Sequence, residues 1–202
     1  MKQIFLFVSV FLAGVFFVAC ESNQADQVSQ SKSTTFPDMT LRRTADSVMQ
    51  LLKGKNLANL KTFIAPKTTV LFSPYSYVDT NTAMRLSVND LNDMFTDTIR
   101  VNWGTYDGSG LPIQLSCGNY YNTFIYNHPF AEADSVFENK SIQRGNSIDN
   151  LSVVFPGNEH VEYFVAGDPK NAGLGWGSLT LVFRKEGNRY FLVGVVNNRW
   201  TI

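Results

Sequence analysis

Residues 178–196 read Ser-Leu-Thr-Leu-Val-Phe-Arg-Lys-Glu-Gly-Asn-Arg-Tyr-Phe-Leu-Val-Gly-Val-Val, and this stretch decides the fold class. Apolar residues alternate with polar ones from its start, which is the period of a half-buried β-strand. The Lys-Glu-Gly-Asn sequence at 185–188 is a hairpin turn signal, and the return strand follows at 190–196. The predicted pairing brings Leu181 and Phe183 near Phe191 and Val193.

Similar alternation predicts more strands on the N-terminal side of this hairpin. One strand is expected at 161–165, and two more at 101–105 and 111–115 flank the turn signal Asp-Gly-Ser-Gly. A short strand is expected at 70–72, ended by Ser-Pro. The C-terminal third is therefore rich in strands that are consecutive along the chain.

Helical spacing dominates the N-terminal part instead. Apolar residues recur every three or four positions over 41–52, and Gly54 stands where a helix C-cap is expected. A second helix is predicted over 57–64, and Ser87 and Ser116 are placed as N-caps of two further helices. Helices followed by antiparallel strands favour an α+β fold, with N-terminal helices packed on a curved antiparallel sheet, over a βαβ parallel fold.

This order of elements resembles the NTF2-like (SnoaL-like) cone, in which a bent sheet wraps around helices and leaves a pocket at its open end. Several segments also resemble an uncharacterised family of secreted or lipid-anchored bacterial proteins. The matching segments are Phe72–Tyr75, Trp103–Gly110, Gly145–Ile148, Val161–Tyr163 and Trp200–Ile202. This resemblance spans the domain and implies no activity, because function cannot be transferred from a fold alone.

The first twenty residues have the pattern of an export signal. Lys2 precedes an apolar run from Ile4 to Ala19, and Cys20 follows directly. The run has about sixteen residues, fewer than the roughly twenty of a membrane-spanning helix. Phe-Val-Ala-Cys resembles a lipobox, which implies that Cys20 becomes the lipidated first residue of the mature chain. An uncleaved anchor helix and a cut elsewhere that leaves Cys20 as a free thiol are the alternatives.

A polar segment separates this signal from the apolar-rich remainder. Residues 21–35 hold no aromatic residue and one large aliphatic residue, so they cannot bury enough surface to order themselves. We therefore divide the chain into a lipoprotein signal peptide at 1–19, a disordered tether at 20–35 and a single α+β domain at 36–202. We expect the protein in the cell envelope, where its lipid holds it at the periplasmic or surface face of a membrane.

Composition excludes several classes of function. Lys and Arg number 17, equal to Asp and Glu, so no basic excess is available for nucleic-acid phosphates. If Cys20 is lipidated, Cys117 has no disulfide partner, and we expect it to be a buried apolar residue. His128 and His160 lack the spacing of metal ligands, and no nucleotide or cofactor motif is found, so we expect neither metal nor cofactor.

The most unusual segment is Trp103–Gly110. Trp103 and Tyr106 offer stacking surfaces, and Asp107 offers a carboxylate, as in a site for a sugar or a peptide. The alternative, which we favour, is a tight turn whose glycines adopt positive φ and whose aromatic residues pack inward. Trp176, in a glycine-rich loop, is either a ligand contact or a cap on the sheet edge.

Glu162, Tyr163 and Arg184 complete the candidate ligand-binding residues. A Glu162 that faces the inside of a cone would be a general acid or base, but alternation favours an outward, solvated Glu162. Arg184 has the same ambiguity, and a pair between Glu162 and Arg184 on neighbouring strands is one outcome. No residue is assigned a catalytic role.

The leading hypothesis is a membrane-anchored envelope lipoprotein, not an enzyme, that binds a small ligand or a protein partner. One alternative is an NTF2-like enzyme that uses acid–base chemistry through Glu162 or Asp107 with Tyr106 or Tyr163. The other is a structural component of envelope assembly.

Overall fold

The computed structural model describes residues 40–92, 94–144 and 147–201. These residues belong to one compact unit, residues 36–202. The predicted signal peptide, Cys20 and the tether lie outside the described residues. Among the helices that are described, none is both long and apolar enough to cross a bilayer.

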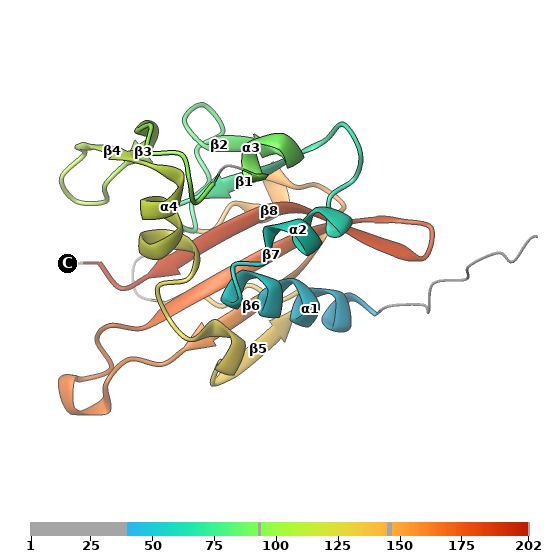
Figure 1. Ribbon diagram of the computed structural model, residues 1–202. Coiled ribbons are helices and arrows are strands. Elements are labelled where there is room, and N and C mark those ends of the chain that lie inside the picture. The colour runs from blue at the N-terminus through green and yellow to red at the C-terminus, as the bar shows by residue number, and fades with distance from the viewer. Residues whose placement is uncertain (1–39, 93, 145–146, 202) are drawn as a thin grey trace, which may run out of the picture. The chain divides into compact units, whose positions relative to one another are not determined.

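A six-stranded sheet forms the centre of the fold, in the order β2-β1-β8-β7-β6-β5 (Figure 1). Neighbouring strands are antiparallel except for β1 and β8, which are parallel. The predicted α+β class is confirmed, with this parallel pair as the exception to the expected antiparallel sheet. The strands are β1 (Thr69–Ser73), β2 (Met84–Ser87), β5 (Ser135–Glu138), β6 (Glu159–Val165), β7 (Gly177–Glu186) and β8 (Arg189–Arg199).

The predicted β7–β8 hairpin is present, but its register differs from the expected one. Its turn is tighter, with Glu186 paired to Arg189. Leu181 faces Val195 and Phe183 faces Leu192, so Phe191 and Val193 lie on either side of the residue opposite Phe183 and neither faces Leu181. The tighter turn sets the pairing of Phe183. An irregularity between Val182 and Phe183, where β8 contains one residue more than β7, shifts the pairing of Leu181 by one further residue.

Helices are distributed along the chain, so the expectation that they are N-terminal is only partly met. Helix α1 (Leu41–Lys53) begins at Thr40, whose side chain accepts a hydrogen bond from the Arg43 N–H, and ends at Gly54 as predicted. Ser87 and Asp90 cap α3 reciprocally, and Ser116 caps α4. The other α-helices and short helical turns are α2 (Leu57–Leu60), α3 (Val88–Asn92), α4 (Cys117–Tyr120), α5 (Leu151–Val154), η1 (Lys61–Phe63), η2 (Tyr121–Ile125), η3 (Phe130–Glu132) and η4 (Pro169–Asn171).

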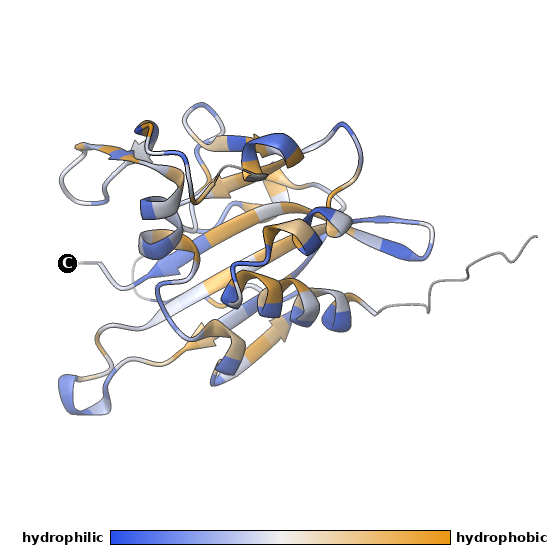
Figure 2. Ribbon diagram, in the orientation of Figure 1, coloured by the Kyte–Doolittle hydropathy of each residue, from blue (hydrophilic) through white to orange (hydrophobic). Residues whose placement is uncertain are grey.

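The larger hydrophobic core lies between α1, α2, α4 and one face of the sheet. Val161, Leu179, Leu181 and Val195 contribute from the strands and are all buried. A separate hairpin, β3 (Val101–Thr105) with β4 (Pro112–Leu115), joins this core. Figure 2 shows hydrophobic residues along the middle of the strands and hydrophilic ones at the β7–β8 tip.

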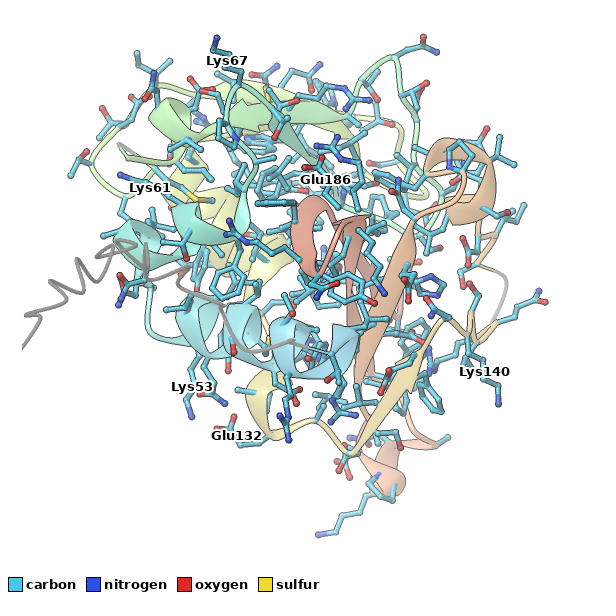
Figure 3. All side chains as sticks on the ribbon, turned by 90° about the vertical axis from the view of Figure 1, so that its right-hand side faces the viewer. Lys53, Lys61, Lys67, Glu132, Lys140 and Glu186 are labelled. Carbon is cyan, nitrogen blue, oxygen red and sulfur yellow. The ribbon has the colours of Figure 1, made fainter. Side chains whose placement is uncertain are left out.

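The opposite face of the sheet is covered by α5 and the segment that precedes it. In Figure 3, α1 with Lys53 lies on one side of the strands and Lys140 lies on the other. A smaller core forms there around Leu71, Val182 and Phe155. Gly194 makes this packing possible, because a Cβ at that position would lie 2.6 Å from the Phe155 ring.

Candidate functional site

Two adjoining clefts contain most of the candidate residues. We call the first the aromatic cleft, lined by residues 73–77, 103–108, Trp176 and 198–201 among others. The second is the polar cleft, lined by His160, Glu162, Ser178 and parts of the 139–160 segment among others. They share a wall made of Ser76, Ser147, Ile148 and Asn198.

The aromatic cleft is a hollow of about 940 Å³ at one end of the sheet. Its walls are the segment that follows β1, the β3–β4 hairpin, the segment that precedes β7 and the residues that follow β8. Four of the predicted site residues line it: Trp103, Tyr106, Asp107 and Trp176. Residues that are far apart in the sequence are therefore gathered at one site.

The Trp103–Gly110 segment has features of both interpretations, the ligand site and the tight turn with inward-packed aromatic residues. Trp103 is fully buried, stacks on Tyr120 with 3.7 Å between ring centroids, and donates its Nε1–H to the Leu115 carbonyl at 2.9 Å. Gly104, with φ of +112°, lets the strand turn away beyond it. Trp103 therefore supports the cleft from behind, and the half-buried Tyr106 lies nearer its mouth.

Asp107 ties the hairpin to the two neighbouring walls. Its backbone N–H donates to the Tyr75 hydroxyl at 3.2 Å, and its Oδ2 accepts from the Thr201 hydroxyl at 2.6 Å. The Trp200 N–H donates to the Trp176 carbonyl at 3.0 Å, which holds these two tryptophans in adjacent segments. Asp107 is exposed, so its carboxylate remains accessible from solvent.

Sequence reasoning missed three aromatic residues of this cleft as site residues. Tyr75 is half-buried, Tyr77 is 57% exposed, and Trp200 is 37% exposed. Large aromatic side chains directly after the predicted end of a strand at Pro74, and after the last predicted strand, were the available signal. Residues beyond the ends of strands lie outside the sheet, although Tyr75 also packs on Phe124 of the larger core.

The polar cleft, of about 800 Å³, lies on the face of the sheet opposite α1. Glu162 on β6 points into it and is only 5% exposed, so the predicted solvated position is wrong. The covering segment supplies Arg144, whose guanidinium forms an ion pair with Glu162 Oε1 and stacks on the Phe164 ring, 3.9 Å from its centroid. Arg184 pairs with Glu186 instead, so the Glu162–Arg184 pair that alternation left open does not form.

Three buried polar atoms in the polar cleft have no hydrogen-bond partner among the described residues. They are Glu162 Oε2, Ser178 Oγ and His160 Nε2. Burial lowers the pKa of His160, so its ring is neutral at neutral pH. A Ser–His nucleophile pair is excluded by register, because Ser178 faces Phe164, four residues from His160, or about 13 Å along the strand.

Tyr163 lies on the other face of the sheet from Glu162. Its hydroxyl donates to Asp46 Oδ1 of α1 at 2.7 Å, and Asp46 also pairs with Arg42. Burial, followed by the hydrogen bond to Asp46, raises the pKa of Tyr163 well above its ordinary value. The predicted residues Glu162 and Tyr163 therefore do not share a site, and Tyr163 has a structural role.

The described residues contain no group of three or more His, Cys, Asp or Glu side chains that could hold a metal ion. Cys117 is half-buried against the larger core, and burial raises the pKa of its thiol. Comparisons with protein-family models, with curated proteins and with solved structures give no match to this chain. The two clefts are therefore interpreted from their own residues.

Proposed function

We propose that this protein is a bacterial envelope lipoprotein, anchored by lipid on Cys20, whose domain binds a small ligand in the aromatic cleft. One observation carries the binding role. Aromatic side chains from four separate segments meet at one hollow without filling it. They are Tyr75, Tyr77, Tyr106, Trp176 and Trp200.

The chemistry of the cleft suits a ligand with an apolar face and a few polar groups. Aromatic rings provide large rigid contact surfaces, and a small number of placed polar groups orient what they hold. Here Asp79, Asp107 and Asn198 supply acceptors, and Arg199 lies at the same wall. The exposed apolar residues Tyr77, Ile148 and Trp200 also gather there, which favours a role in binding at this cleft.

The NTF2-like cone is our proposal for the family of the fold. Two features support it. The helices α1 and α2 precede β1 and share the larger core with one face of the sheet. A cleft also lies beyond the ends of β1 and β8, and the resemblance implies a pocket at one end of the sheet.

Binding is favoured over acid–base catalysis by the positions of the predicted acids and bases. Neither Glu162 nor Tyr163 is among the described residues that line the aromatic cleft. Asp107, the remaining candidate base, is exposed and hydrogen-bonded to Thr201. An NTF2-like enzyme would have to use Asp107 with Tyr106 alone.

The anchor rests on the sequence and on the physics of lipid attachment. One acyl chain holds a protein only marginally, whereas a lipobox cysteine carries a diacylglycerol and often a third chain. The test is mass spectrometry of the mature N-terminus together with membrane fractionation of Cys20→Ala. We expect this variant to lose both the lipid mass and the membrane association, and Cys117→Ala, the matched control, to retain them. A mature chain that begins elsewhere with an unmodified sulfur would overturn the anchor.

The ligand site is tested with the full chain, purified from membranes and analysed by native mass spectrometry for retained small molecules. We expect Tyr77→Ala and Trp176→Ala to lose the molecule that the wild-type protein retains. Ile99→Ala removes a side chain that is 67% exposed and outside the cleft, so it should retain that molecule. A molecule that survives both cleft substitutions is bound elsewhere and contradicts the proposal.

A further inference from the structure

We infer that the polar cleft is a second binding site, built for an uncharged, hydroxyl-rich ligand, a saccharide. The site lies on the face of the sheet opposite α1 and does not depend on the aromatic cleft being occupied. The inference rests on unpaired buried groups, on their donor and acceptor character, on the local charge balance and on the apolar wall beside them.

Buried polar atoms are almost always hydrogen-bonded, and leaving one unpaired is costly. Within the part of the chain that the structure describes, the polar cleft contains three such atoms on two neighbouring strands: Glu162 Oε2, His160 Nε2 and Ser178 Oγ. His160 and Glu162 are two residues apart on β6, so their side chains emerge on the same face. Glu162 faces Thr180, which places Ser178 one step further along β7 on that face. The three atoms therefore form one row that a ligand can satisfy together.

Two of these three atoms require a donor from the ligand. A carboxylate oxygen only accepts hydrogen bonds. The neutral His160 ring is hydrogen-bonded to the backbone at Lys140, which leaves Nε2 as an acceptor. Ser178 both donates and accepts. A ligand for this row must present several donors spaced along one edge.

Charge decides between hydroxyl and ammonium donors. The negative charge of Glu162 is already balanced by Arg144, and the two side chains are only 7% and 12% exposed. Arg144 is held in place by the Phe164 ring. Arg144 itself lines the adjoining aromatic cleft. A cation beside Glu162 would approach the guanidinium that is already paired with it, whereas a hydroxyl group donates without adding charge. The neutral polar side chains Asn198 and Ser147 also line the cleft. Its other charged lining residues among those described are Lys140, Asp149 and Glu159.

The other wall is apolar and suits the C–H face of a sugar ring. Val182, Val196 and Phe155 form it and belong to the smaller core. A volume of about 800 Å³ leaves room for more than one ring. The wall shared with the aromatic cleft gives a longer saccharide a route from one cleft to the other.

The test is saturation-transfer NMR and calorimetry on the full chain in a detergent that has no sugar headgroup. The probes are glucose, N-acetylglucosamine and their linear trimers, with glucosamine as the ammonium comparison, each at about 10 mM, above the Kd of a weak millimolar complex. We expect binding of at least one neutral saccharide. No binding of any neutral saccharide, or binding of glucosamine alone, would overturn the inference.

Ser178→Ala is the decisive variant, because it deletes a hydroxyl that none of the described residues bonds to. We expect an unchanged or higher Tm together with a roughly three- to tenfold loss of saccharide affinity, the range for one hydrogen bond. Ser47→Ala on α1, on the far side of the sheet, is the matched control and should bind normally. Tyr77→Ala separates the two proposals, because Tyr77 lines the aromatic cleft and not the polar cleft, whereas Trp176 also contacts the Phe164 ring on which Arg144 stacks. Saccharide binding that is lost in Tyr77→Ala but kept in Ser178→Ala would place the sugar in the aromatic cleft and refute the second site.

Discussion

Removing either partner of the Arg144–Glu162 ion pair should destabilise the domain strongly. Their side chains are 12% and 7% exposed, so water cannot solvate the charge that remains. Breaking a buried pair by deleting one partner costs about 3–5 kcal/mol, whereas an exposed pair contributes at most about 1 kcal/mol. We expect Glu162→Gln and Arg144→Met each to lower the free energy of unfolding by about 3 kcal/mol.

The double variant Arg144→Met/Glu162→Gln isolates the interaction between the two side chains. It leaves no unpaired charge, so its stability should lie within about 1–2 kcal/mol of the wild-type protein, since buried pairs are often replaceable. The two single effects would then fail to add by several kcal/mol, as expected for residues in direct contact. Part of the residual loss in Arg144→Met comes from the stacking of the guanidinium on Phe164.

The assay is urea unfolding at neutral pH, with the midpoint and slope compared across the four proteins. Arg184→Met is the matched control, because the Arg184–Glu186 pair is 41% and 49% exposed and should contribute less than about 0.5 kcal/mol. If both single variants unfold with losses below about 1 kcal/mol, then Glu162 is solvated in solution. The polar cleft would then lack the cover that the structure gives it.

Three further predictions concern the two faces of the sheet. Burial lowers the pKa of His160 in the folded state, so the stability that its neutral ring contributes is present above the unfolded pKa of 6.5 and is lost as the pH falls below 6.5. His160→Gln should therefore lose less stability than the wild-type protein between pH 7 and about pH 5, measured by unfolding at each pH. Parallel stability curves for the two proteins would contradict this. Tyr163→Phe should lower the free energy of unfolding by about 1.5–3 kcal/mol at neutral pH, because the Tyr163 hydroxyl donates to the Asp46 carboxylate. The pKa of Tyr163 is raised in the folded state, so the wild-type protein should also lose stability above about pH 10. The variant should show a smaller loss over that pH range. Gly194→Ala should lower the free energy of unfolding by about 1–3 kcal/mol, because the added Cβ overlaps the Phe155 ring. Thermal unfolding measures this loss. Adding Phe155→Leu should recover part of the lost stability if the overlap is its cause.

Elements with strong local signals were predictable from the sequence. The apolar spacing of α1, the Ser87–Asp90 cap and the β7–β8 turn all depend on residues close together in the chain, and the structure contains them. The extra residue in β8 was not predictable, because a bulge changes the register without changing the composition. The parallel pairing of β1 with β8 likewise joins segments more than a hundred residues apart.

The candidate site was predictable only where its residues are close together in the sequence. Trp103–Gly110 is conspicuous because its aromatic and glycine residues are adjacent in sequence. The environment of Glu162 depends on Arg144, which lies in a segment with no regular apolar period, so alternation alone pointed to solvent. The separation of Glu162 from Tyr163 follows directly from alternation, and the structure bears it out.

The place of β8 has a consequence for how the chain is assembled. This strand follows all the others in sequence, yet it lies between β1 and β7 in the middle of the sheet. Before it arrives, both neighbours present a free edge of backbone N–H and C=O groups. A chain that leaves the ribosome N-terminus first therefore cannot complete the sheet until β8 has emerged. We expect the sheet to close in one late, slow step, because long-range strand pairing is slow.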